Sequence, residues 1–204
     1  NHDFLSVDNR ESLVYLKLDS DKFEFDSLGL DDCLSLQHVS VSAECKKFKA
    51  IDDLVYVCSN DEKMELKFCP SDRQGVLEIP EGVKHIGALF CWRCKGLTAV
   101  HLPDSIETIG FGAFRHCCNL TTVTIGKSVK AIGDCAFFDC DKLESVTIAA
   151  TSLPATPLQN YEGLRTRLKT FQLHRTLYVP KGCVPLYASH TPWRDFLYIG
   201  EIGG

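Results

Sequence analysis

The amino-acid sequence predicts an α/β solenoid, in which short units of one strand and one helical turn stack along a common axis. Three segments align without gaps: "LEIPEGVKHIGALFCWRCKGL", "VHLPDSIETIGFGAFRHCCNL" and "VTIGKSVKAIGDCAFFDCDKL". Independent columns repeat every 23 residues: a branched aliphatic residue at 79, 102, 125 and 148, glycine at 87, 110 and 133, and cysteine at 94, 117 and 140. A unit this short cannot bury its apolar side chains alone, so consecutive units have to stack.

The N-terminal third follows the same period in a degenerate form. We interpret residues 1–45 as degenerate coils, because Leu18 in "LVYLKL" and Val41 in "LQHVSV" lie 23 residues apart. Cys33 precedes Leu36 by the same spacing that separates Cys94 from Leu97. Residues 46–75 then predict an inserted hairpin, since the apolar-rich "LVYVC" and "MELKFC" flank the polar "SNDEK".

The regular repeats occupy residues 76–150. Alternation in "LTAVHL" predicts a short strand that points Val100 and Leu102 inward and Ala99 and His101 outward. "GAFRHC" and "CAFFDC" predict a short helical turn on the opposite side of each coil. Their Ala-Phe pairs occupy a slot that the first regular coil fills with Phe90 and Cys91.

The period fails after Ile148, and residues 151–204 predict an insertion followed by a C-terminal cap. "TSLPATPLQNYEGLRTRLKTF" contains prolines and a basic, partly helical stretch, and "RTLYVP" predicts one more strand. A solenoid has to close its open end, and bulky aromatic residues suit that role. The closing segment concentrates Tyr187, Trp193, Phe196 and Tyr198.

Composition is typical of a single soluble domain spanning residues 1–204. The chain is 45% hydrophobic and 24% charged, and its net charge of −5 comes without a basic stripe for nucleic acid. No apolar run reaches the length of a transmembrane helix. The chain starts at Asn1 without an initiator methionine, so a signal peptide was either removed or never present.

The repeat carries a specific likeness to a known family. "LPDSIETIGFGAFRHCCNLTTVTI" follows the pattern "IPxxVxxIGxxAFxxCxxLxxVxI" and resembles the BspA-like class of leucine-rich repeats, common in Bacteroides and relatives. "TLYVPKGCVPLYASHTPWRDFLYI" and "IDDLVYVCSNDEKMELKFCP" are similar to the closing segment and the inserted hairpin of those proteins. The likeness covers nearly the whole chain and departs from the family in the first coils and in the insertion at 151–170.

The resemblance implies a right-handed leucine-rich-repeat solenoid in a secreted, surface-anchored or lipid-anchored protein. It also implies an extracellular protein or glycan as partner, with adhesion as one role, and no shared catalytic residues or cofactor. A non-enzymatic binding or adhesion module is therefore the leading hypothesis. A structural spacer that presents another domain is the alternative, and a cysteine-dependent enzyme is a remote one.

The cysteine motifs favour a structural role over chemistry. Cys33, Cys94, Cys117 and Cys140 form one column that faces the core, where a small and weakly polar side chain packs well. "CWRC" and "HCC" suggest zinc, but a second cysteine pair is missing because four residues separate Cys135 from Cys140. Disulfides along the column are the other alternative, although parallel side chains disfavour the bond's dihedral angle. The sequence therefore predicts no catalytic, cofactor or metal site.

Outward strand positions form the candidate binding face. Stacking predicts one continuous ladder, and its hydroxyl-rich middle suits hydrogen bonding to a peptide or glycan. Exposed strand positions also favour Ser and Thr for their β-propensity alone. The residues are Tyr15, Lys17, His38, Ser40, His101, Thr122, Thr124, Ser145 and Thr147, with Glu78 and Ala99 between them. The hairpin and a basic run are two further candidates; the run comprises Arg165, Arg167, Lys169, His174 and Arg175.

Overall fold

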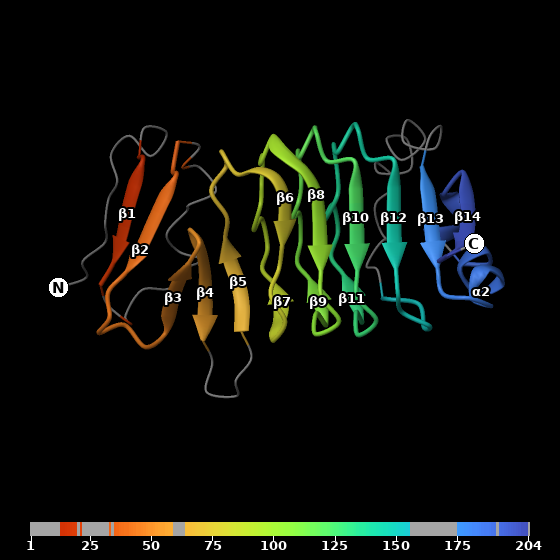
Figure 1. Cartoon of the computed structure of the whole chain (residues 1–204), viewed down its shortest axis with the longest axis horizontal. Coiled ribbons are helices and arrows are strands. Elements are labelled where there is room, and N and C mark those ends of the chain that lie inside the picture. Colours follow the sequence, from red (N-terminus) through yellow and green to blue (C-terminus); the bar gives the residue numbers. More distant parts are fainter. Residues whose placement is uncertain are drawn as a thin grey trace.

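The chain folds into an elongated β-solenoid of about six turns, with β1 at one end and β14 at the other (Figure 1). The computed structural model describes residues 13–19, 21, 33, 35–58, 64–155, 175–190 and 192–203. The stretch from 156 to 174, most of the first 32 residues and the tip of the predicted hairpin at 59–63 lie outside these residues. No helix in the described part is long and apolar enough to cross a membrane.

The main sheet contains six parallel strands in the order β14-β13-β12-β10-β8-β6. The regular period sets the register from β8 to β12, where Ala99 lies beside Thr122 and Thr122 beside Ser145. Ser145 then pairs with Thr176, and Thr176 with Tyr198. The sequence separation between paired residues is thus longer than the repeat period across the insertion and slightly shorter than it after the insertion. The 23-residue period thus holds through the regular coils and fails toward the C-terminus. The strands are β6 (Gln74–Glu78), β8 (Gly96–Leu102), β10 (Thr122–Ile125), β12 (Ser145–Ile148), β13 (Thr176–Val179) and β14 (Tyr198–Glu201).

The strands of a second six-stranded sheet follow one another along the long axis of the solenoid, in the order β11-β9-β7-β5-β4-β3. β4 is antiparallel to its two neighbours, β3 and β5, whereas β5, β7, β9 and β11 are parallel to one another. The β4–β5 pair lies where the sequence predicts a hairpin, and β3 adds a strand that the sequence analysis did not predict. The strands are β3 (Phe48–Ile51), β4 (Leu54–Cys58), β5 (Met64–Phe68), β7 (Val83–Ile86), β9 (Thr108–Ile109) and β11 (Ala131–Ile132). β1 (Tyr15–Leu18) and β2 (His38–Val41) form a separate parallel pair.

The predicted helical turns are wrong: in the described residues, "GAFRHC" and "CAFFDC" form irregular turns rather than helices. Residues with positive φ interrupt each turn, including Arg93 at 61°, His116 at 62° and Asp139 at 56°. Alternate backbone N–H groups bond sideways to the next coil, as in Phe114 N to Ala136 O at 2.8 Å, and those between them bond three residues back within the turn, as in Arg115 N to Gly112 O at 3.0 Å. The architecture is therefore a β-solenoid with few helices rather than an α/β coil.

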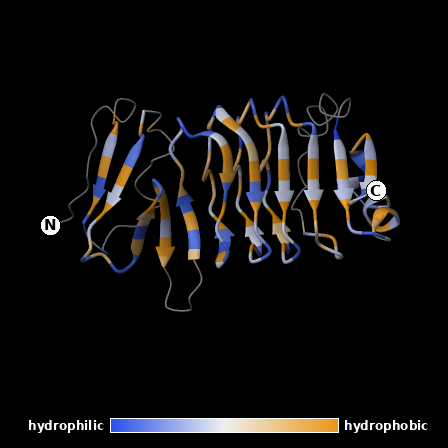
Figure 2. Cartoon of the chain, viewed as in Figure 1, coloured by the Kyte–Doolittle hydropathy of each residue, from blue (hydrophilic) through white to orange (hydrophobic). Residues whose placement is uncertain are grey.

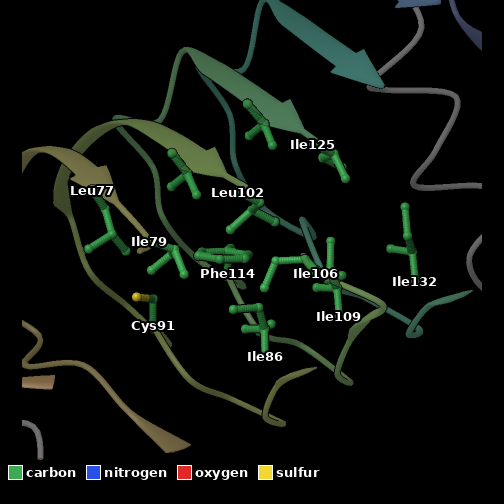
Figure 3. Packing of buried hydrophobic residues seen from close by; sticks show 14 of the residues in the cluster. Leu77, Ile79, Ile86, Cys91, Leu102, Ile106, Ile109, Phe114, Ile125 and Ile132 are labelled. Carbon is green, nitrogen blue, oxygen red and sulfur yellow. The ribbon is translucent and has the colours of Figure 1, made fainter. Parts of the chain in front are cut away.

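The core runs through the middle of the coils, because the strands of the main sheet alternate inward apolar and outward, mostly polar residues (Figure 2). Figure 3 shows the resulting columns, in which Leu102 stacks between Ile79 and Ile125 of adjacent coils, all three buried. Burying one large apolar side chain is worth about 1.5 to 3 kcal/mol, so several such columns per coil supply most of the stacking energy.

A second, smaller core lies at the N-terminal end, and β4 separates the two. Leu54 and Tyr56 of this strand belong to the main core, whereas Val55 packs into the N-terminal core with Leu18 and Phe48. Because successive side chains of a strand point to opposite faces, β4 is covered on both sides. The antiparallel strands β3, β4 and β5, which we call the hairpin sheet, thus lie between the first coils and the regular repeats.

The C-terminal cap contains α2 (Val184–Ala188) and a 3-10 helix, η4 (Trp193–Asp195). Tyr187 and Trp193 are buried with ring centroids 5.6 Å apart, and the Tyr187 hydroxyl donates to the Ala150 carbonyl at 2.9 Å. These contacts attach the two helices to the end of the last regular coil. Tyr198, which the sequence analysis assigned to the same aromatic cluster, instead lies on β14 with 60% of its surface exposed.

Candidate functional site

The outward side chains of the main sheet form two rows that run along the solenoid from strand to strand. We call these two rows the strand face. Strand register fixes the rows because each pair of neighbouring strands brings equivalent positions side by side. The inward neighbours of these residues, such as Val100 and Val123, are buried and hold the strands in place. The first row is Val76, Ala99, Thr122, Ser145, Thr176 and Tyr198, and the second is Glu78, His101, Thr124, Thr147 and Tyr178.

The two rows have a hydroxyl-rich middle and an aromatic C-terminal end. Tyr178 and Tyr198 are 37% and 60% exposed. The Tyr198 ring lies over Gly200, where an added Cβ would come within 2.7 Å of ring atom Cε1. Because Gly200 is the partner of Tyr178 in the register, its lack of a side chain leaves room for both rings at this end of the face. The sequence analysis missed Tyr178, although its position between Leu177 and Val179 in a predicted strand was the signal.

A hydrogen-bonded histidine–glutamate pair lies at the other end of the face. His101 Nδ1 is 2.6 Å from Glu78 Oε1, and both side chains are largely exposed. Neighbouring strands hold the two groups opposite each other, since Glu78 is the register partner of His101. The strand face therefore offers charge at one end, hydroxyl groups in the middle and aromatic rings at the other end.

The first four predicted residues lie apart from this face, so the continuous ladder is a wrong prediction. Tyr15, Lys17, His38 and Ser40 lie on the β1–β2 pair, which has no hydrogen-bonded neighbour in the main sheet as far as the structure describes it. The Tyr15 hydroxyl lies 2.6 Å from Ser40 Oγ, and His38 Nδ1 lies 3.3 Å from an Asp53 carboxylate oxygen. The physical reason is the hairpin sheet, which separates the first coils from the repeats.

The basic run is described only at its last residue. Arg175 is partly buried and donates from Nη2 to the Cys140 carbonyl at 2.8 Å, and burial lowers the pKa of its guanidinium to about 10. Arg175 stays charged at neutral pH, but this hydrogen bond directs its partly buried guanidinium to the backbone of the last regular coil. Arg165, Arg167, Lys169 and His174 lie outside the described residues.

The cysteine column is buried and makes a regular set of hydrogen bonds. The thiols of Cys94, Cys117 and Cys140 donate to backbone carbonyls of the preceding coil, at 3.3 Å to Pro70, 3.2 Å to Cys91 and 3.1 Å to Phe114. All three are free thiols, and the disulfides considered as an alternative are not formed between them. Cys33 is also buried, but it belongs to the N-terminal core.

Three buried thiols gather where the hairpin sheet meets the first regular coil, and we call them the thiol cluster. The sulfur atoms of Cys69, Cys91 and Cys94 all lie within 4.8 Å of one another, the spacing of possible metal ligands. Burial raises the pKa of the Cys69 thiol, but hydrogen bonds from Cys91 and Cys94 outweigh it and lower that pKa to about 5. Burial raises the pKa of Cys91. The sequence analysis looked for a second cysteine pair downstream of "CWRC" and missed Cys69, which lies upstream of this motif, directly after β5.

Comparison with known proteins now places the repeats in a family. The family model described as the BspA type leucine rich repeat region matches residues 68–179, more than half of the chain, in six copies. The chain belongs to the BspA-type leucine-rich repeat family. The BspA-type repeats include the thiol cluster and all of the strand face except Tyr198. No curated protein matches the chain significantly.

Solved structures support the same fold for these BspA-type repeats. A leucine-rich repeat protein from Bacteroides capillosus is 23% identical with a TM-score of 0.50, over 56% of this chain and 90% of that one. The pneumococcal vaccine antigen PcpA is 17% identical with a TM-score of 0.57, over 94% of this chain. The chain spans only 56% of that antigen's length. At these identities the likeness shows the fold alone.

Proposed function

We propose that this chain is a non-enzymatic binding module that acts at the cell surface or after secretion and binds a protein partner on the strand face. Membership of a repeat family whose members are surface or secreted proteins supports the location. The observation that carries the binding role is the exposed pair Tyr178 and Tyr198 beside rows of hydroxyl groups on a regular sheet.

The chemistry of the strand face favours a protein as its partner. Tyrosine offers a large apolar surface and a polar tip at a low cost in side-chain entropy, and it is enriched among the residues that dominate protein interfaces. Short hydroxyl side chains such as Thr122, Thr124 and Thr147 add hydrogen bonds without long chains that binding would have to order. Both kinds of group stand on strands whose inward side chains are buried, so the face is organised before a partner binds.

The surroundings of the histidine-cysteine motif support a role without catalysis. A nucleophilic cysteine needs a base within hydrogen-bond distance. His116 Nδ1 instead lies 3.2 Å from the Asp139 carboxylate, and the Cys117 thiol donates to the Cys91 carbonyl in the core. His116 also has a positive φ of 62°, which suits a turn residue that links two coils.

A binding screen tests this proposal. The purified chain would be passed over immobilised extracellular-matrix proteins and glycans, beside a tyrosine variant with Tyr178→Ala and Tyr198→Ala. We expect the wild type to bind at least one protein and the tyrosine variant to bind it at least about tenfold more weakly, the usual loss at a dominant interface residue. A second variant with His101→Ala, Thr122→Ala, Thr124→Ala and Thr147→Ala tests the histidine end and the hydroxyl-rich middle of the face in the same way.

The matched control carries Lys130→Ala, at an exposed position, and Lys84→Ala, at a partly exposed one, both on the side of the second sheet. Circular dichroism would first establish that every variant keeps its strand content. Equal losses in the control and in the tyrosine variant would contradict a site on the strand face. Binding to glycans alone would contradict a protein partner, and no binding at all would favour the spacer role.

A further inference from the structure

We propose that Cys69, Cys91 and Cys94 form a binding site for a thiophilic metal ion of the Zn²⁺ type, which braces the hairpin sheet against the first regular coil. The three thiols come from two separate parts of the chain, the residue directly after β5 and the turn after β7. All three are free, and at most 3% of any of them is exposed.

The positions of the sulfur atoms fit thiolate coordination. Zinc binds thiolate sulfur at about 2.3 Å, which places two ligands of a tetrahedral site about 3.8 Å apart. The three sulfur atoms lie within 4.8 Å of one another, so small side-chain rotations bring them to this spacing. Sulfur ligands favour zinc and other soft ions over magnesium and calcium, which prefer oxygen.

A backbone oxygen beside two of the three sulfur atoms is the candidate for a fourth ligand. The Pro70 carbonyl is 3.7 Å from the sulfur of Cys69 and 3.3 Å from that of Cys94. A sulfur and an oxygen that share one tetrahedral zinc ion lie about 3.6 Å apart. Pro70 follows Cys69 directly in the sequence, so one short segment delivers both a thiolate and a carbonyl.

The cluster departs from the packing of the sister coils. Cys91 occupies the slot that Phe114 and Phe137 fill in the following coils, where their rings stack with centroids 5.4 Å apart. Figure 3 shows Cys91 among the buried side chains of the main core. In the first regular coil the ring stands one residue earlier, at Phe90, which packs edge-to-face on Phe114 at 6.1 Å. This inversion leaves the smaller Cys91 side chain in the slot, beside the other two thiols.

The cluster also marks the point where the regular period begins. Leu66 of β5 pairs with Ile86 at a step shorter than the period, whereas Ile86 pairs with Ile109 at the regular spacing. An ion bound by Cys69 on one side and by Cys91 and Cys94 on the other would link the hairpin sheet, where the spacing is short, to the first coil with the regular spacing. Cys117 is a natural comparison, because it has the same column position, burial and thiol-to-carbonyl bond as Cys94 but lies outside the cluster.

The test uses the whole chain, purified with reductant and chelator and then freed of both. Zn²⁺ would be titrated in competition with a chromophoric chelator, and Co²⁺ would be added separately to read thiolate-to-metal charge-transfer absorption. We expect one Zn²⁺ per chain, a Co²⁺ spectrum typical of thiolate ligands, a Tm that rises with Zn²⁺, and three thiols that Zn²⁺ protects from alkylation.

Two variants and a control separate the cluster from the other cysteines. Cys69→Ser removes one ligand, and Cys91→Phe restores the ring of the sister coils, so that one variant stays informative if the other fails to fold. Both should lose the bound Zn²⁺ and the rise in Tm, whereas Cys117→Ser should keep both. The proposal is overturned if the wild type binds no Zn²⁺, if Cys117→Ser loses it as fully as Cys69→Ser, or if Cys91 and Cys94 are found joined in a disulfide.

Discussion

Replacing Phe114 by alanine should destabilise the solenoid strongly, because this ring links three coils. Phe114 is fully buried, with ring centroids 6.1 Å from Phe90 in the coil before and 5.4 Å from Phe137 in the coil after. Deleting a buried phenylalanine side chain costs about 3 to 5 kcal/mol, and well-packed aromatic pairs place it in the upper half of that range. We therefore expect a loss of about 4 kcal/mol in the free energy of unfolding.

Urea unfolding followed by circular dichroism measures this loss. With a slope of about 2 kcal/mol per molar urea, the midpoint should fall by about 2 M. Phe111→Ala is the matched control, because Phe111 lies in the same turn with 48% of its surface exposed, and its midpoint should move by less than about 0.5 M. If Phe114→Ala shifts the midpoint no more than Phe111→Ala does, the stacked ring column does not hold the coils together.

Three further predictions concern other contacts between coils. Gly110→Ala should cost about 1 to 3 kcal/mol, because an added Cβ would lie 2.6 Å from the backbone of the preceding coil; urea unfolding measures the cost. Tyr187→Phe should cost about 1 to 3 kcal/mol at pH 7 by leaving a buried carbonyl unpaired. Burial raises the pKa of Tyr187 from 10 to about 12, so its contribution to the free energy of unfolding is complete below pH 10 and is lost as the pH rises toward 12. Urea unfolding at stepped pH would show this loss, and a stability difference from Tyr187→Phe that does not change with pH would contradict it. A hydrogen bond from Lys130, at 2.6 Å, lowers the pKa of Glu107 below 4.5. The contribution of this pair to stability is therefore present above pH 4.5 and lost in more acidic solution. The difference in unfolding free energy between wild type and Lys130→Met should shrink in acidic solution and with added salt.

The solenoid could be predicted from the sequence because its columns recur at residues that pack against their own equivalents. Ile79, Leu102 and Ile125 are one such column, and each is buried in the main core. The turns could not be predicted, because the positive φ of His116 and Arg93 occurs at residues other than glycine and carries no sequence signal. Sideways hydrogen bonds between coils stabilise this conformation, and they exist only once the coils have stacked.

The candidate site was predictable only where the period is regular. His101, Thr122 and Thr124 lie on the strand face at the positions expected from alternation. Tyr198 was misplaced because β14 pairs with β13 at a spacing shorter than the period, so the repeat could not assign its side. Cys69 was missed for the same reason, since it directly follows β5, where the spacing between coils is also shorter.

The central claim is that one face of the main sheet binds the partner, and hydroxyl-radical footprinting tests it most directly. Side-chain oxidation would be measured in the chain alone and in complex with a partner identified in the binding screen, with Phe111 as the exposed reference outside the face. The account predicts that the partner lowers oxidation of Tyr178 and Tyr198 and leaves Phe111 unchanged. Protection of Phe111 with full oxidation of both tyrosines would contradict it.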